Sequence, residues 1–252
     1  MTGPRAPAVE LAALHLDRSD PAKSLTRACR SSLSVSCSVG LTLAADAALA
    51  QRVSLAAEGP LAARGEALQI NLGEGPCVEA LRRYRPVLAA DLDDEKVVAD
   101  WPMYATEARA HGIRAVFALP VVGPRPSTPQ PGLVLSLYRD RTGTLPEQDL
   151  DTARTHADAA ELLLLSVPAP EGDEVAEAWL LPTDALVHQA TGMISYRHDL
   201  TAAQALALLR AHAHTRHTDL SDVAHAIVHE GLHLPDPADP PEPPEPPGSP
   251  EG

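Results

Sequence analysis

Residues 184–234 form the most strongly patterned segment of this chain and read DALVHQATGMISYRHDLTAAQALALLRAHAHTRHTDLSDVAHAIVHEGLHL. Apolar residues recur there at helical spacing in three short runs. The pattern predicts three amphipathic helices, which can form a compact bundle when they are anchored at one end or paired with a second copy. The segment contains no catalytic constellation. We therefore interpret it as an all-α recognition module.

Each predicted helix carries one apolar stripe. The first stripe contains Leu186, Val187, Ala190, Met193 and Ile194, the second Ala205, Leu206, Leu208, Leu209 and Ala213, and the third Leu220, Val223, Ala224, Ile227 and Val228. Thr201 is predicted to cap the second helix, with Gln204 at the spacing of a capping box, and Thr218 to cap the third. Gly192 lies inside the first stripe, where a glycine favours close approach by another helix or a ligand.

Several of these residues occur in an order that resembles a known family. They are Ala190-Thr191-Gly192-Met193, Gln204-Ala205, Leu209-Arg210, Ala213, Leu220, Val223 and Ala224. Together they resemble an ANTAR domain, which implies a small all-helical RNA-binding module of bacterial transcription antiterminators. Thr191 stands where the family usually has lysine, which weakens the expected phosphate contact, and Gln204 stands where it usually has glutamate.

The candidate RNA-binding residues are Gln189, Thr191, Arg197, Arg210 and Arg216. Thr191 and Arg210 follow from the family pattern, whereas Arg197 and Arg216 are chosen for their charge. Arg210 has an alternative interpretation as a structural residue that only solvates its helix.

The charge of the module limits the RNA affinity that can be expected. Residues 184–234 contain three arginines, no lysine and five acidic residues, a formal charge of −2, and the whole chain has a net charge of −14. Because phosphate neutralisation supplies most sequence-independent affinity, we expect weak binding, or binding as a dimer that doubles the contacts. Alternatively, the helices have lost RNA affinity and form a non-enzymatic dimerisation or protein-interaction module.

Eight of the eleven histidines lie in the same module. His225 and His229 are spaced i, i+4, as are His229 and His233, so each pair lies on one helix face. A zinc site needs three or four converging ligands, and no carboxylate or cysteine here completes a known pattern. We interpret the histidines as polar surface residues that gain charge near or below pH about 6.5, and we expect no metal site.

Upstream, the pattern changes to short strands between helices. Residues 34–43 alternate between apolar and small or polar side chains, as in a half-buried strand. Further strands are predicted at residues 51–57, 67–71, 86–89, 115–122 and 132–138, and helices at residues 21–32, 77–83, 104–111 and 147–167. This order predicts an α+β fold with an antiparallel sheet and flanking helices.

Four motifs in this part carry a second resemblance. They are Leu72-Gly73-Glu74-Gly75-Pro76-Cys77, Trp101-Pro102, Gly112-Ile113-Arg114-Ala115 and Gly132-Leu133-Val134-Leu135-Ser136-Leu137-Tyr138. In this order they resemble a GAF domain, a sensory fold common in bacterial signalling. The resemblance implies a sensory domain with a possible small-molecule ligand, which the sequence does not identify.

The segment around Cys77 leaves several interpretations open. Gly73 and Gly75 allow the chain to turn before the helix that begins near Cys77. That helix start is either an ordinary loop-to-helix junction or an anion site formed by its N–H groups. Cys77 is interpreted as a buried small hydrophobe rather than a thiol of low pKa, and Trp101 either lines a pocket or covers the sheet.

The predicted organisation has five parts. Residues 1–19 are an N-terminal extension, 20–167 a GAF-like sensory domain, 168–183 a linker, 184–234 the ANTAR-like module and 235–252 a disordered tail. The tail holds nine prolines and five acidic residues with no base, so it cannot bury a core; it is a solubilising segment, or an acidic arm that competes with RNA. GAF domains often dimerise through terminal helices, so the resemblance implies a homodimer.

Composition and motifs argue against three other classes of protein: membrane proteins, disulfide-bonded proteins and enzymes. No apolar run approaches the roughly 20 residues needed to span a membrane and no signal-peptide pattern is present, so we expect a cytoplasmic protein without a membrane partner. Cys29, Cys37 and Cys77 form no CxxC pair and are interpreted as reduced thiols. Because G-x-S-x-G, P-loop and HExxH motifs are missing, we expect no catalytic residues and no cofactor.

The predicted function is a signal-responsive RNA-binding regulator that acts by transcription antitermination on hairpin RNA.

Overall fold

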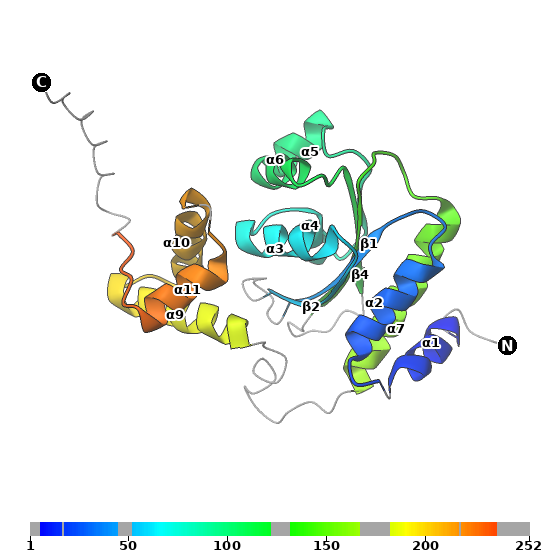
Figure 1. Cartoon of the computed structure of the whole chain (residues 1–252), viewed down its shortest axis with the longest axis horizontal. Coiled ribbons are helices and arrows are strands. Elements are labelled where there is room, and N and C mark those ends of the chain that lie inside the picture. Colours follow the sequence, from blue (N-terminus) through cyan, green and yellow to red (C-terminus); the bar gives the residue numbers. More distant parts are fainter. Residues whose placement is uncertain are drawn as a thin grey trace, which may run out of the picture. The chain divides into compact units, whose positions relative to one another are not determined.

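The computed structural model describes residues 6–16, 18–44, 52–121, 132–166, 182–216 and 218–235. The chain divides into two units, Met1–Ala185 and Leu186–Gly252; the first contains a sheet with helices and the second contains helices (Figure 1). Residues 168–181 of the predicted linker and 236–252 of the predicted tail lie outside the described residues.

A five-stranded antiparallel sheet organises the first unit. Its strands are β1 (Ser38–Ala44), β2 (Arg52–Glu58), β3 (Val87–Ala89), β4 (Ala115–Val121) and β5 (Gly132–Arg139), in the order β2-β1-β5-β4-β3. The central strand pair aligns Leu41 of β1 with Leu135 of β5. The predicted α+β class with an antiparallel sheet is thereby confirmed.

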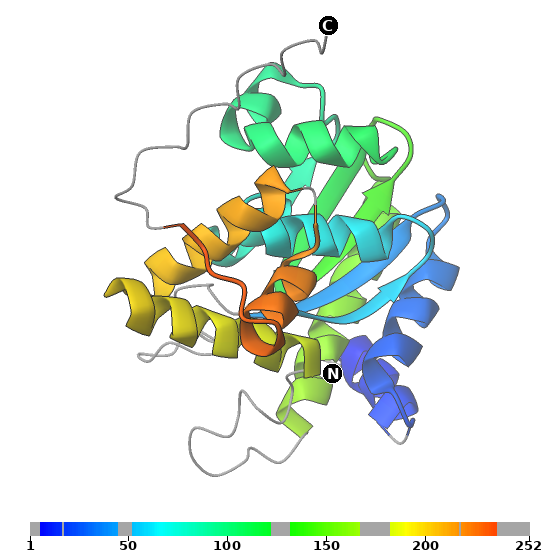
Figure 2. The same ribbon diagram turned by 60° about the vertical axis from the view of Figure 1, so that its left-hand side comes forward.

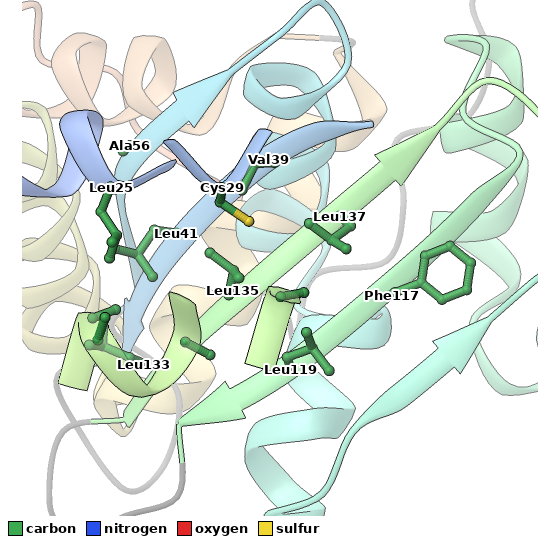
Figure 3. Packing of buried hydrophobic residues seen from close by; sticks show 14 of the residues in the cluster. Leu25, Cys29, Val39, Leu41, Ala56, Phe117, Leu119, Leu133, Leu135 and Leu137 are labelled. Carbon is green, nitrogen blue, oxygen red and sulfur yellow. The ribbon is translucent and has the colours of Figure 1, made fainter. Parts of the chain in front are cut away.

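Helices cover one face of the sheet with an aliphatic core. They are α1 (Ala6–Leu16), α2 (Pro21–Ser32) and α7 (Glu147–Ser166), and they lie on the same side of the strands (Figure 1). Alternate residues of each strand point to this face: Leu41 and Leu135 do so, and Leu25 of α2 packs against them (Figure 3). On α7, Ala153 and Ala157 are buried in the same cluster.

The opposite face of the sheet is covered by α3 (Ala62–Leu72), α4 (Pro76–Arg83) and α6 (Pro102–Ala110), with the short α5 (Glu95–Asp100) beside α6 (Figure 1). Trp101, Tyr104 and Ile113 are buried together in the core on this side. Both faces are therefore buried, which explains why all seven residues of β1 are inaccessible to solvent.

The predicted strand at residues 67–71 is wrong, because these residues belong to helix α3. The segment alternates apolar and polar side chains, which is typical of a strand. Its buried positions, however, include Ala62, Gly65, Glu66 and Gln69, and this spacing is helical. Two of the four are polar, so the buried face of the helix is not visible as an apolar stripe in the sequence.

The structure differs from the sequence prediction at three further helices. Helix α1 lies within the predicted N-terminal extension, and α5 is absent from the sequence prediction. Asp94 starts α5 by accepting hydrogen bonds from the backbone N–H groups of Lys96 and Val97. The third helix of the second unit begins after Asp219, so the prediction of Thr218 as its N-cap is wrong.

Three helices form the described part of the second unit: α9 (Pro182–His198), α10 (Ala202–Thr215) and α11 (Leu220–His229). They lie side by side in both views (Figures 1 and 2). Most of the buried side chains come from the predicted stripes: Ala190, Ile194, Ala205, Leu206, Leu209, Ala213, Leu220, Val223, Ala224 and Ile227; Thr191 and Leu234 are buried besides these. Leu186, Val187, Met193, Leu208 and Val228 are only half-buried.

The connection between α9 and α10 is tight and well hydrogen-bonded. Asp199 takes the left-handed conformation, with φ 51°. The backbone N–H of Leu200 donates to the carbonyl of Ser195 at 3.1 Å, and the Ser195 hydroxyl donates to the carbonyl of Leu200 at 2.6 Å. Thr201 and Gln204 then form the predicted capping box, which is confirmed.

Candidate functional site

A cluster of buried polar side chains lies on the face of the sheet that α3 and α4 cover. The hydroxyl of Tyr138 donates to the Glu66 carboxyl at 2.7 Å, and Thr42 donates to the other carboxyl oxygen. The side-chain amide of Gln69 donates to the Tyr138 hydroxyl at 2.8 Å. All four residues are at most 1% exposed. The interior of this domain is therefore polar at the level of β1 and β5, despite the aliphatic composition of the chain.

Two glycines make room for this cluster. A Cβ atom at Gly40 would overlap the Glu66 carboxyl, and one at Gly65 would overlap the ring of Tyr138. Neither glycine is required by its own backbone conformation, since neither has a positive φ. The described glycines with positive φ are Gly59, Gly73, Gly75, Gly112, Gly143 and Gly231. Gly40 and Gly65 thus serve the packing of Glu66 and Tyr138.

Burial changes the acidity of the cluster. Removal of the Glu66 carboxyl from water raises its pKa to about 7, and this rise is opposed by the hydrogen bond from Tyr138 and by the positive charge of Arg52. The same burial, together with the nearby Glu66, raises the pKa of the Tyr104 and Tyr138 hydroxyls well above the usual value. Glu66 is therefore the group in this cluster whose charge changes near neutral pH.

Gln69 also closes the N-terminus of helix α4. Its amide oxygen accepts a hydrogen bond of 2.6 Å from the backbone N–H of Cys77. Of the two interpretations of this helix start, the structure favours the ordinary junction, because a side chain of the protein occupies the place of an anion. Gly73 (φ 73°) and Gly75 (φ 122°) make the predicted turn before this helix.

The cysteines and Trp101 belong to the core. Burial raises the pKa of the Cys77 thiol far above its usual range, that of Cys29 to about 12 and that of Cys37 to about 11. Cys77 is 1% exposed, so its interpretation as a small buried hydrophobe is confirmed. All three cysteines are free. Trp101 is 8% exposed and packs in the core with Tyr104, which answers the question that the sequence left open.

The second unit presents most of the predicted RNA-binding residues to solvent. Gln189 and Arg197 on α9 are exposed, as is Arg216, which ends α10. Arg210 is half-buried in the middle of α10. Thr191 is different: it is only 8% exposed, and its hydroxyl donates to the carbonyl of Val187 at 2.7 Å. The side chain at the position of the family lysine is thus turned back onto its own helix.

Charge is unevenly distributed in this module. Residues 184–218, which include α10 and most of α9, contain three arginines and two acids, Asp184 and Asp199, a formal charge of +1. Residues 219–234, which include α11, contain three acids and neither lysine nor arginine. The module's overall charge of −2 therefore conceals a positive part formed by the first two helices.

One exposed residue is absent from the predicted sites. Tyr196, near the end of α9, is 94% exposed, the largest exposure among the large hydrophobic side chains of the described residues. Gly192, one turn earlier on the same helix, is also exposed, and a Cβ atom there would meet nothing within 4 Å. No described residue makes the predicted close approach to Gly192. The sequence places an aromatic residue here but does not reveal that no side chain covers it.

The histidines make local contacts in the described part of the module. The rings of His225 and His229 have centroids 4.7 Å apart, and Nδ1 of His225 lies 3.3 Å from a carboxylate oxygen of Glu230. Partial burial, followed by the charge of Arg216, lowers the pKa of His212. Among the described residues, no three histidine, cysteine or acidic side chains converge as metal ligands would. Nor does any described helix have the length and apolar character needed to cross a membrane.

Comparisons with known proteins agree with this two-part architecture. The sequence model of the GAF domain matches residues 15–164, and that of the ANTAR domain matches residues 181–228. The chain belongs to the GAF domain family, and its C-terminal helices form an ANTAR domain. Both are regulatory domains: GAF domains sense signals, and ANTAR domains are known for RNA binding in antitermination.

No curated protein matches the chain. One similar solved structure is described as a type II free methionine-R-sulfoxide reductase from Thermoplasma acidophilum. It is 16% identical, with a TM-score of 0.40, and the match covers 61% of this chain and 94% of that chain.

Proposed function

We propose that this protein is a signal-responsive RNA-binding regulator that acts by transcription antitermination on hairpin RNA. The observation that carries the proposal is the separation of charge within the ANTAR match: Arg197 of α9 and Arg216, which caps α10, are exposed on a segment, residues 184–218, that contains two acids. Phosphate neutralisation by such residues is the main sequence-independent source of RNA affinity. Arg210, half-buried on α10, is included in the proposed interface, and Gln189 supplies an exposed amide.

The proposed mechanism is binding and not catalysis. A protein that binds one RNA fold more tightly than its competitor shifts the population toward that fold, so stabilising an antiterminator hairpin disfavours the terminator. The GAF domain would supply the signal. The hydroxyl of Tyr104 is buried without a hydrogen-bond partner among the described residues, which supports a small polar ligand there.

The proposed regulator has two domains and acts as a homodimer in the cytoplasm. We place residues 20–167 in the sensory domain and 184–234 in the RNA-binding module, joined by a linker and followed by the acidic tail. A homodimer would double the arginines available to one RNA, which a module with three arginines needs if it is to bind tightly. Access to nascent transcripts requires a cytoplasmic location.

A titration with RNA tests this function. The full-length protein is mixed at low salt with an RNA of two short-looped hairpins and, separately, with an unstructured RNA of equal length. We expect preference for the hairpins and an affinity that falls as salt increases. Equal affinity for both RNAs, or no binding by a folded protein, would contradict the proposal.

A second function is favoured by the state of Thr191. The side chain at the family's lysine position is buried and bonded to its own helix, and the module as a whole carries −2. Both facts suit a module that has lost RNA affinity and serves dimerisation or protein interaction. A folded protein that self-associates but binds no RNA would support this alternative.

A further inference from the structure

The most exposed large aromatic side chain among the described residues stands on the helix that begins the ANTAR match. Tyr196 lies near the end of α9 and is 94% exposed. An aromatic ring that no neighbour covers leaves a large apolar area in water, which is unfavourable by itself. Its position in the RNA-binding module, one residue before the exposed Arg197, suggests that a ligand covers the ring.

The surroundings of Tyr196 on its own helix are open. Gln189, Gly192 and Tyr196 are separated by three and four positions, so they follow one another along one face of α9. All three are exposed. Long side chains in helices generally point back toward the N-terminus, so the turn that contains Gly192 is the part of α9 nearest to a ring at position 196. Since a Cβ atom at Gly192 would meet nothing within 4 Å, the space above the helix backbone is free beside the ring.

We propose that Tyr196 and Gly192 form a stacking site for one unpaired base of the RNA hairpin loop. Bases in loops are splayed out and commonly stack on aromatic side chains. In this site the base lies on the Tyr196 ring over the bare backbone of Gly192. The amide of Gln189 is placed to bond the edge of the base, and Arg197 is placed to contact its phosphate.

The chemistry of this face distinguishes a base from other occupants. A helix face that pairs with a second copy is usually a continuous apolar stripe, whereas this one contains an amide, a glycine and a phenol, with the guanidinium of Arg197 at its border. Residues 185–198 of α9 contain no acid, in a chain with 34 acidic residues. An anionic ligand with flat aromatic groups fits both observations, and single-stranded RNA has that composition.

The proposal rests on the proposed function, and its test uses the full-length protein with the same two-hairpin RNA. Each loop position in turn carries 2-aminopurine, whose emission changes when the base stacks on a protein ring. The variants are Tyr196→Ala, Tyr196→Phe and Gly192→Ala. Tyr84→Ala is the matched control, because Tyr84 is an exposed tyrosine of the other unit at 55%.

We expect Tyr196→Ala to weaken hairpin binding roughly 5- to 150-fold, the range for loss of one stacked base, and to abolish an emission change at one loop position. Tyr196→Phe keeps the ring and should bind like the natural protein, as should Tyr84→Ala. Gly192→Ala should weaken binding because the methyl group occupies the space of the base. It should also raise the Tm of the module, since alanine favours helices over glycine.

Other outcomes overturn the proposal in distinguishable ways. If the natural protein prefers hairpins and Tyr196→Ala binds them equally well, the stacking site is wrong and the RNA-binding function stands. If the natural protein shows no preference for hairpins, both are wrong. If Tyr196→Ala changes the oligomeric state while RNA affinity stays constant, the ring belongs to a self-association surface.

Discussion

The hydroxyl of Tyr138 on β5 donates a hydrogen bond of 2.7 Å to the carboxyl of Glu66 on α3, 72 positions earlier in the chain. This bond joins a helix to the middle of the sheet inside a buried polar cluster. Most buried charges in proteins are paired with a charge or bound to a metal. Here hydroxyl groups hold the carboxyl, and burial raises its pKa to about 7.

The first prediction is that the stability of the GAF domain depends on pH through Glu66. An acid whose pKa rises on folding stabilises the folded state below the pKa of the unfolded chain, and this contribution is lost as pH rises through the folded pKa. Glu66 moves from 4.5 to about 7, so stability from this group should fall between these values, by on the order of 3 kcal/mol. Glu66→Gln should remove this part of the pH dependence.

Urea denaturation between pH 4 and 8 measures this effect. The second tryptophan, Trp179, is replaced by Phe so that Trp101, buried in the same domain as Glu66, alone reports unfolding. The difference in unfolding free energy between this protein and its Glu66→Gln variant should change across the interval and level off above it. A difference that is constant with pH would show that the pKa of Glu66 is the same in the folded and unfolded states.

The second prediction concerns Asp149, which is 1% exposed. Its carboxylate accepts hydrogen bonds from the N–H and hydroxyl of Ser34, both at 2.9 Å, and from the N–H of Val35 at 3.1 Å. Asp149 therefore fixes the segment between α2 and β1. Asp149→Ala leaves these donors unsatisfied and should lower the unfolding free energy by about 1–3 kcal/mol.

The matched control for Asp149 is two residues away on the same helix. Asp151→Ala removes an exposed carboxylate that pairs with Arg154 at 2.9 Å, and such surface pairs contribute about 0–1 kcal/mol. Denaturation of both variants under the same conditions compares them. Equal losses of stability would mean that the bonds to Ser34 and Val35 contribute nothing specific.

The third prediction compares two glycines inside helices. Gly65→Ala on α3 places a methyl group against the Tyr138 ring, and overpacking of this kind costs about 1–3 kcal/mol. Gly192→Ala on α9 meets nothing within 4 Å, so only the gain in helix propensity of about 1 kcal/mol applies. Thermal denaturation should show shifts of opposite sign. A stable Gly65→Ala protein would show that Tyr138 can move aside.

The fourth prediction concerns the salt dependence of RNA binding. Arg197→Ala should weaken hairpin binding and reduce the slope of log affinity against log salt by about 0.7–0.9, the value for one phosphate contact. Arg154→Ala, which removes an exposed arginine of α7, serves as the control and should leave the slope unchanged. An unchanged slope for Arg197→Ala would place this residue outside the phosphate contacts.

Much of the fold could be predicted from periodicity. Helix α2 has the predicted bounds, and the apolar stripes of α10 and α11 supply most of their buried side chains. Helix α3 could not be predicted, because two residues of its buried face, Glu66 and Gln69, are polar. Their burial is made possible by hydrogen bonds to Tyr138, which lies far away in the sequence. Periodicity detects burial only when the buried residues are apolar.

The candidate site was less predictable than the fold. The two residues chosen by charge, Arg197 and Arg216, are exposed, and their contact with RNA stays a prediction. The family pattern pointed to Thr191, whose hydroxyl is bonded to its own helix. Tyr196 is absent from the predicted sites because tyrosine is intermediate in burial, so the sequence does not show whether its ring is covered, and only the structure shows that it is exposed.

The hydrogen-bonded turn from Ser195 to Gln204 has a consequence for the strength of the proposed RNA binding. Its capping box and the paired bonds between Ser195 and Leu200 fix the backbone that carries Tyr196 and Arg197. The conformational entropy of this segment is therefore lost during folding and not at the moment of binding. A ligand that docks here has only side chains to order, so a preorganised backbone partly offsets the small number of positive charges on the module.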